Sequence, residues 1–337
     1  MKKTRILIAG IGGVGGYFGG LLAKHFYQSK EVEIIFYARG KHLQEIQKNG
    51  LMVTKGDNGF IAIPTLATDN PNEIRIVDFI ILCTKSYDIE TVIEQLAVCQ
   101  NKDTIILPLL NGVDSKDRIK SILPNNLILD GCAYIVSRLT QAGKIENLAN
   151  IETVYFGLDH FESEKLNLLE TLFKQANINA TLSKNISSII WEKFIYISPT
   201  ATATSYFDSS IGEILADPKK LEIILQLIEE VKQIATAKNI SISDDITNLT
   251  LKKLKNLPFE TTSSMHSDFK SKKSNTELKS LTEYIVTEGK KHQILTLTFE
   301  RLLTELKKKA ANMHLKSGAE FKTFLFLRSR LTHQIEG

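Results

Sequence analysis

Hydrophobic positions in the first half of the chain follow two alternating patterns. Short runs rich in β-branched residues predict strands, and the segments between them, with apolar residues three and four apart, predict helices. Strands that alternate with helices form βαβ units, so the pattern predicts an α/β domain with a parallel sheet. The predicted strands are Arg5–Ala9, Val32–Tyr37, Val77–Cys83 and Thr104–Leu107, and the predicted helices are Val14–Tyr27, Lys41–Asn49 and Ile89–Ala97.

Further strand-like segments extend this first domain. Residues 51–63 contain the turn sequence Asp-Asn-Gly at positions 57–59, which predicts a small hairpin excursion. Runs at Ala133–Ser137 and Thr153–Phe156 continue the strand-rich pattern. The first domain is therefore predicted to cover residues 1–184.

The second half of the chain has a helical pattern. Apolar residues recur three and four positions apart, for example at Leu221, Ile224, Leu225, Ile228 and Val231. A mainly α-helical second domain is therefore predicted over residues 185–308. Residues 309–337 form a C-terminal extension, which could be an extra helix used in self-association or a packed or frayed tail, and the sequence favours neither.

A glycine-rich loop follows the first predicted strand. Gly10, Gly12 and Gly15 form the pattern G-x-G-x-x-G, with Gly13 and Val14 between them, directly before a predicted helix. The three glycines suit a tight turn, a close approach of the backbone to a pyrophosphate, and close packing of helix on strand. The helix N-terminus also offers N–H groups to phosphates. These residues predict a dinucleotide-binding Rossmann domain; the alternative is a loop with only a packing role.

The end of the second predicted strand indicates which dinucleotide binds. An enzyme that uses NAD usually places Asp or Glu there to bind the ribose 2′-hydroxyl. The segment FYARGKH has no acid and instead places Arg39 just after the strand, with Lys41 close behind. A guanidinium suits a 2′-phosphate, so NADPH is the predicted cofactor. The alternative is that Arg39 only caps the loop.

Composition and charge exclude several other classes of protein. Apolar residues make up 43% of the chain and charged residues 24%, which is typical of globular proteins, and the net charge of +4 is small for 337 residues. No basic run with interleaved aromatic residues indicates nucleic-acid binding, and no run of about 20 apolar residues predicts a membrane span. Lys2 and Lys3 precede an apolar run too short for a secretory signal.

The cysteine and histidine residues predict neither disulfides nor a metal site. Cys83, Cys99 and Cys132 form no CxxC pair, and the seven histidines lack HxxxH or HxxH spacing. Reduced thiols in a chain of this size are typical of the cytoplasm. We therefore expect a cytoplasmic protein without a bound metal.

Several segments together resemble the ketopantoate reductase (2-dehydropantoate 2-reductase) family. They occur in the family's order and at nearly its spacing, from about residue 5 to residue 305. The resemblance implies a Rossmann domain followed by a helical domain, with the active site between the two. The segments are GIGGVGG, YARGKHLQEIQKNGL, ILCTKSYD, LPLLNGVD, WEKF, SSM and NTELKSLTEYIVTEGKK.

The resemblance also implies roles for five residues. Lys85 in ILCTKSYD would lie near cofactor and substrate, and Asn111 in LLNGVD would lie beside the nicotinamide and the substrate. Lys193 in WEKF would be the catalytic lysine, and Ser264 in SSM would bind substrate. Glu277 in NTEL would complete the catalytic pair by holding the substrate, although one residue is inserted shortly before it. The alternative for each is a plain role as a loop, helix or capping residue.

One departure from the family puts the substrate in doubt. The family helix that carries the lysine also supplies asparagines about four and eight residues further on. Here those positions are Ile197 and Ala201. The hydroxyls of Ser198, Thr200 and Thr202 are close in sequence, but we expect them on other parts of the helix.

Three hypotheses follow for the function. The leading one is NADPH-dependent reduction of 2-dehydropantoate to pantoate in pantothenate and coenzyme A biosynthesis, in which Lys193 stabilises the developing oxyanion and donates a proton. The second is a related reductase of another 2-oxo acid, and the third is a non-catalytic protein that binds NADPH. The expected partner is a small 2-oxo acid, with neither nucleic acid nor membrane. A homodimer is compatible with the chain, whose oligomeric state the sequence does not decide.

Overall fold

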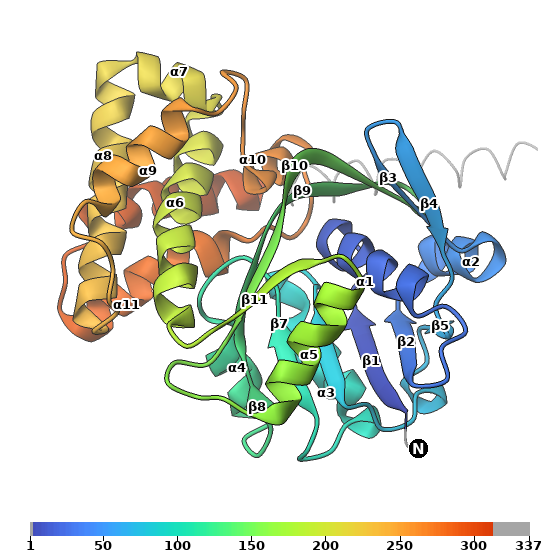
Figure 1. Cartoon of the computed structure of the whole chain (residues 1–337). Helices are drawn as coiled ribbons and strands as arrows, with labels where there is room; N and C mark the ends of the chain where they lie inside the picture. Colours follow the sequence, from blue (N-terminus) through green and yellow to red (C-terminus); the bar gives the residue numbers. More distant parts are fainter. Residues whose placement is uncertain (1–2, 313–337) are drawn as a thin grey trace, which may run out of the picture. The chain divides into compact units, whose positions relative to one another are not determined.

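The strands predicted in the first half form one parallel sheet. The computed structural model describes residues 3–312, and its first sheet has the order β5-β2-β1-β6-β7-β8 with every neighbouring pair parallel (Figure 1). All residues of β6 are buried, because helices cover this sheet on both faces. The strands are β1 (Thr4–Ala9), β2 (Val32–Tyr37), β5 (Leu66–Thr68), β6 (Phe79–Leu82), β7 (Ile105–Pro108) and β8 (Leu127–Ile128).

The helices predicted between these strands are present as α1 (Gly13–His25), α2 (Gly40–Asn49) and α3 (Ile89–Gln95). The hydrophobic pattern did not single out α4 (Ser115–Ile122) or α5 (Glu164–Gln175). In α4 only Ser115 and Ile119 are buried, so the helix has too few apolar positions to show a clear period. Short 3₁₀ segments complete the connections at η1 (Pro71–Glu73), η2 (Ser86–Asp88) and η3 (Leu96–Cys99).

The predicted hairpin is present, but it is not a small excursion. Its two strands, β3 and β4, pair antiparallel, and β3 also pairs in parallel with β10 in a sheet of order β11-β10-β3-β4, with β9 paired to β10. The partner strand comes much later in the chain, so the local pattern could not indicate it. The strands are β3 (Leu51–Lys55), β4 (Asn58–Ala62), β9 (Asp130–Gln141), β10 (Lys144–Gly157) and β11 (Asn179–Ser183).

Helix α1 lies between the two sheets (Figure 1). Its Phe18 and Leu22 belong to the same buried cluster as Ile8 of β1 and Ile145 of β10. The apolar positions of α1 therefore bury against both sheets, which explains why its hydrophobic residues do not keep to one stripe. The second sheet thus covers the helix that follows the glycine-rich loop.

The described residues of the second unit are helical and contain no strand. The chain divides between Trp191 and Glu192, within the long helix α6. An α/β unit followed by a mainly helical unit confirms the predicted fold class. The elements are α6 (Ile186–Phe207), α7 (Ile211–Ala216), α8 (Pro218–Ala237), α9 (Ile246–Lys255), α10 (Ser264–Lys270), the π-helix η4 (Lys279–Glu283), α11 (Tyr284–His292) and a helix over residues 297–312.

Apolar residues that recur three and four positions apart in the second half of the chain lie on the buried faces of helices. In α8, Ile224, Ile228 and Val231 are fully buried, and Asp217 caps the helix by accepting hydrogen bonds from the backbone of Lys219 and Lys220. Of the predicted C-terminal extension, residues 309–312 belong to the helix over residues 297–312. Residues 313–337 lie outside the described part of the chain.

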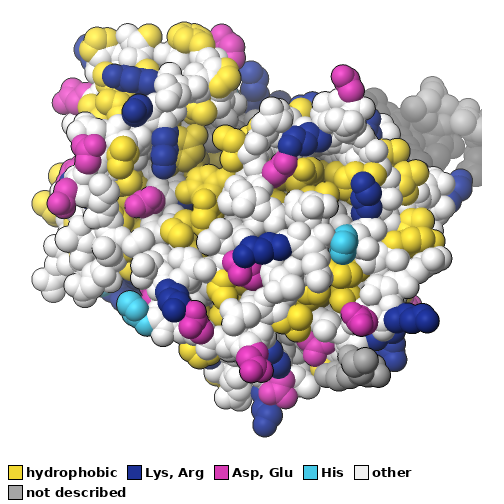
Figure 2. Space-filling view, in the orientation of Figure 1, with side chains coloured by type: hydrophobic (Ala, Val, Ile, Leu, Met, Phe, Trp, Pro, Cys, Tyr) yellow, Lys and Arg dark blue, Asp and Glu magenta, His cyan; other side chains and the backbone are white. Residues whose placement is uncertain are grey.

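Charged side chains of both signs are interspersed on the face shown in Figure 2. This distribution fits an ordinary surface better than a binding face for a polyanion. Among residues 3–312, no helix is long and apolar enough to cross a membrane, and no group of three or more His, Cys, Asp or Glu could hold a metal.

Candidate functional site

The carboxyl ends of four parallel strands lie side by side in the first sheet. Ala9 of β1 pairs with Tyr37 of β2 and Leu82 of β6, and Leu82 pairs with Pro108 of β7. Loops that leave this edge of an open parallel sheet are where such folds bind ligands. The predicted cofactor residues all lie in these loops or at the helix that follows: Gly10, Gly12, Gly13, Val14, Gly15, Arg39, Lys85 and Asn111.

The glycines of the first loop have distinct surroundings. Gly10 has a φ of +94°, and a Cβ there would lie 2.9 Å from the Thr84 nitrogen; a Cβ on Gly15 would lie 2.1 Å from the Gly10 oxygen. These two glycines allow the loop to pack closely against β6 and α1. By contrast, a Cβ on Gly12 would have no described atom within 4 Å outside its immediate neighbours.

The open side of Gly12 fits a pyrophosphate. Gly12 is the N-cap of α1, whose first turn contains no acidic residue. The helix therefore offers its N-terminal N–H groups to an anion without a competing carboxylate in that turn. The neighbouring Cys83 is not a reactive group, because burial raises the pKa of its thiol to about 12.

Substitutions at Gly12 and Gly15 should separate binding from folding. Gly12→Ala places a methyl group in the open space, so we expect a stable protein with weakened NADPH binding. Gly15→Ala forces a methyl group against the Gly10 carbonyl and should cost roughly 1–3 kcal/mol of stability. Thermal unfolding without cofactor and fluorescence titration with NADPH measure the two effects. Unchanged NADPH binding in Gly12→Ala would show that the phosphates lie elsewhere.

Arg39 is available to bind a phosphate. It is the N-cap of α2, directly after β2, and its side chain is 83% exposed. Its Nη2 atom lies 3.4 Å from Oδ2 of Asp88 in η2. The sequence around Arg39 contains no acidic residue. The carboxylate of Asp88 lies beside Arg39 because the fold brings η2 close to the end of β2.

Lys85 and Asn111 are half-buried at the starts of the loops after β6 and β7. Arg118 of α4 connects these loops, and the sequence did not single it out. Its Nη2 donates to the Ser86 oxygen at 2.7 Å and to Glu90 at 2.6 Å. Burial alone would lower the pKa of Arg118, but its hydrogen bonds with Glu90 and the charge of Asp114 raise it. Arg118 therefore stays charged and stabilises both loops.

Lys193 is buried in α6, with only 8% of its surface exposed. Residues four, seven and eight positions later share its face of the helix, and these include Ile197, Thr200 and Ala201. Thr200 follows Lys193 by seven residues, which is almost two full turns, so it lies only about 20° from Lys193 around the helix. Its hydroxyl donates to the Tyr196 oxygen at 2.6 Å, within the helix.

Glu277 is buried, with only 3% of its surface exposed. It directly precedes a segment that packs on α6, on a different face from Lys193. Ser198 Oγ donates to the Leu281 oxygen at 2.6 Å, and the hydroxyls of Thr202 and Thr282 lie 2.8 Å apart. Leu281 and Thr282 belong to the π-helix η4, a rare geometry that often marks functional sites. These contacts hold the chain around Glu277 against α6, the helix that carries Lys193.

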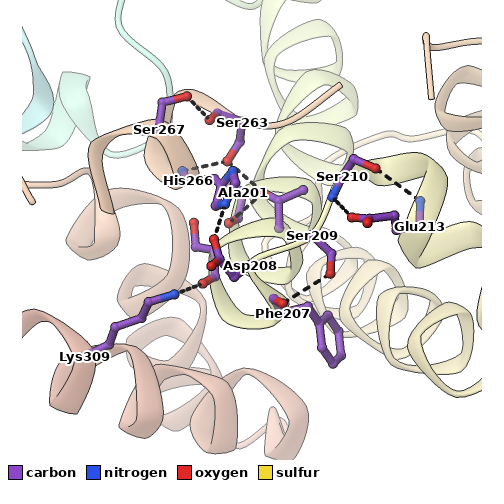
Figure 3. A network of polar contacts seen from close by, with 12 residues as sticks. Ala201, Phe207, Asp208, Ser209, Ser210, Glu213, Ser263, His266, Ser267 and Lys309 are labelled. Carbon is purple, nitrogen blue, oxygen red and sulfur yellow. Dashed lines mark hydrogen bonds and ion pairs between the residues drawn. The ribbon is translucent and has the colours of Figure 1, made fainter. Parts of the chain in front are cut away.

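Ser264 is exposed at the start of α10, and its neighbour Ser263 forms the helix cap. Ser263 Oγ accepts from the backbone N–H of His266 at 3.0 Å and lies 2.8 Å from Oγ1 of Thr204 in α6. His266 Nε2 lies 2.6 Å from Oδ1 of Asp208, just after α6 (Figure 3). Two contacts therefore fix the start of α10 against the end of α6, and with it the position of Ser264.

Comparisons with known proteins place both halves of the chain in one family. A model described as "Ketopantoate reductase PanE/ApbA" matches residues 6–159, and one described as "Ketopantoate reductase PanE/ApbA C terminal" matches residues 185–310.

Three known proteins show the range of this similarity. The structure of 2-dehydropantoate 2-reductase from Porphyromonas gingivalis W83 is 34% identical, with a TM-score of 0.79 over 90% of this chain and 99% of that one. An uncharacterized oxidoreductase of Bacillus subtilis, YkpB, is 24% identical over 90% of this chain and 97% of its own. D-mandelate dehydrogenase, solved with NADH and anilino(oxo)acetate, is 22% identical over 92% of this chain and 100% of that one, with a TM-score of 0.79, and shares the fold.

Proposed function

The chain belongs to the ketopantoate reductase family, and from its site residues we propose that it reduces a 2-oxo acid with NADPH, with 2-dehydropantoate as the leading substrate. The burial of both Lys193 and Glu277 in the helical unit carries this proposal. Lys and Glu are almost never fully buried without a specific partner or role. A buried lysine and a buried carboxylate on elements that pack together fit a site for a polar substrate.

The proposed chemistry assigns each group one task. NADPH, bound along the glycine-rich loop, would supply the hydride to the ketone carbon. Lys193 would stabilise the negative charge that develops on the carbonyl oxygen and donate a proton to it. Glu277 would accept a hydrogen bond from a hydroxyl of the substrate and so orient it.

The choice of NADPH over NADH is supported by Arg39. Its guanidinium is exposed just after β2, where a 2′-phosphate would be recognised. The nearby Asp88 competes for Arg39 only weakly, because an exposed ion pair contributes about 0–1 kcal/mol.

The substrate is best tested with a panel of 2-oxo acids. Purified protein should oxidise NADPH in the presence of 2-dehydropantoate, followed by the absorbance of the reduced nicotinamide. Faster turnover of a 2-oxo acid with an apolar branch would instead favour a related reductase. The apolar side chains of Ile197 and Ala201, on the same face of α6 as Lys193, support this alternative. If the protein binds NADPH but reduces no 2-oxo acid, the non-catalytic hypothesis replaces both.

Ile197→Asn should improve the use of 2-dehydropantoate. Ile197 is half-buried on the Lys193 face, so a substrate hydroxyl facing it would lack a hydrogen-bond partner, at a cost of about 1–3 kcal/mol. An asparagine amide would recover part of this, so we expect KM to fall roughly threefold to tenfold with kcat within a few-fold. Steady-state kinetics with Ile197→Leu as the control test this. An unchanged ranking of 2-oxo acids would place Ile197 outside the pocket.

A further inference from the structure

His42 joins the glycine-rich loop to a hairpin of the second sheet. Its Nε2 atom lies 2.7 Å from the carbonyl oxygen of Ile11, between Gly10 and Gly12. Its Nδ1 atom lies 2.9 Å from the backbone nitrogen of Gly143, in the turn between β9 and β10. The ring thus contacts two segments that are far apart in the sequence.

Only one form of the imidazole satisfies both contacts. The Gly143 N–H donates, so Nδ1 must be unprotonated, and the Ile11 carbonyl accepts, so Nε2 must carry the hydrogen. Burial lowers the pKa of His42, and the hydrogen bond to Ile11 opposes this only in part. The ring is therefore neutral at neutral pH.

The hairpin turn is a firm anchor for this ring. Gly143 has a φ of +73°, and a Cβ there would lie 2.4 Å from Cγ of Glu45 in α2, so the turn packs tightly on the helix that carries His42. The same hairpin reaches the start of α1, since a Cβ on Gly13 would lie 2.3 Å from the Ser137 oxygen. The second sheet therefore approaches the start of α1 directly and reaches the loop through His42.

The contact with Ile11 fixes a peptide group in the loop. In a trans peptide the C=O and the N–H point in opposite directions, so holding the Ile11 carbonyl also fixes the direction of the Gly12 N–H. Gly12 is the residue with open space beside it. His42 also lies in the first turn of α2, the helix that Arg39 caps. One short helix therefore supports both phosphate-binding regions.

We propose that His42 is a positioning residue for the dinucleotide, which orients the Gly12 N–H toward the pyrophosphate by holding the Ile11 carbonyl. This rests on the proposed binding of NADPH at the loop. The loss of His42 should weaken NADPH and NADH equally, because both cofactors carry the same pyrophosphate. This distinguishes His42 from Arg39, whose expected partner is present only in NADPH.

Three substitutions separate the two contacts of the ring. His42→Gln keeps an N–H donor near the position of Nε2, His42→Asn keeps an acceptor near the position of Nδ1, and His42→Phe removes both. We expect His42→Gln to bind both cofactors within about threefold of the unchanged protein. His42→Asn and His42→Phe should bind both roughly fivefold to tenfold more weakly, the effect of one lost hydrogen bond. Fluorescence titration gives Kd, thermal unfolding gives Tm, and the exposed His25 (His25→Gln) is the matched control.

Two outcomes with the variants would overturn the proposal. Unchanged Kd values in His42→Asn and His42→Phe would show that the loop is oriented without the ring. Equal losses in all three variants, in step with Tm, would show that His42 only supports the fold. If the unchanged protein binds neither cofactor, the proposed function fails as well. The titration of the unchanged protein tests this separately from the variants.

Discussion

Replacing Lys193 with alanine should lower kcat for 2-oxo acid reduction by roughly 100- to 10,000-fold, the range expected when a positioned general acid is removed. The lysine ammonium is the group proposed to stabilise the oxyanion and supply its proton. The glycine-rich loop belongs to the other unit, so NADPH should still bind. Stopped-flow or steady-state NADPH oxidation measures the rate, and nicotinamide fluorescence measures the binding.

Two further variants make the Lys193 result specific. Because Lys193 is buried, Lys193→Ala also leaves a space, whereas Lys193→Met fills it without a charge. Both should lose activity, and Lys193→Met should keep its Tm close to that of the unchanged protein. Lys253→Ala, at an exposed position of α9, is the control and should keep full activity. Normal turnover by Lys193→Met would refute the catalytic role.

Arg39→Ala should weaken NADPH binding by about 10- to 100-fold and leave NADH binding nearly unchanged. A charge-assisted hydrogen bond to phosphate contributes roughly 1.5–3 kcal/mol to binding. NADH has no 2′-phosphate, so the substitution removes no such hydrogen bond from its complex. Titration of both cofactors at one fixed salt concentration measures the difference, since added salt screens an exposed charge.

Asp88→Asn is the matched control for Arg39. It removes the carboxylate beside the guanidinium, so NADPH should bind as tightly as before or slightly more tightly. If Arg39→Ala weakens NADPH and NADH to the same extent, Arg39 acts on the loop and the preference for NADPH needs another cause.

The local pattern of apolar residues was sufficient to predict the strands of the first sheet. The predicted strands at Arg5–Ala9 and Val32–Tyr37 are β1 and β2 within one residue, because a strand buried on both faces is apolar nearly throughout. The two charged residues in these strands, Arg5 and Glu33, pair with each other at 2.7 Å. The G-x-G-x-x-G spacing was likewise sufficient to predict the loop, since a side chain at Gly10 or Gly15 would collide with the loop backbone or with the residues just after β6. These features depend on neighbours in the sequence and on rules of chain geometry.

Other features of the site depend on contacts between distant segments. The hairpin at residues 51–63 was predicted, but its pairing with β10 was not, because strand pairing depends on the register of two distant segments. The carboxylate of Asp88 beside Arg39 and the two contacts of His42 arise in the same way.

The sequence by itself therefore determined the class of the protein, its first sheet, its glycine-rich loop and the identity of its candidate residues. These follow from the periods of strands and helices and from family motifs that are local in the chain. Only the tertiary structure decided that Lys193 and Glu277 are buried and that His42 holds the Ile11 carbonyl. Burial and hydrogen-bond partners are properties of segments brought together by folding, so no local pattern contains them.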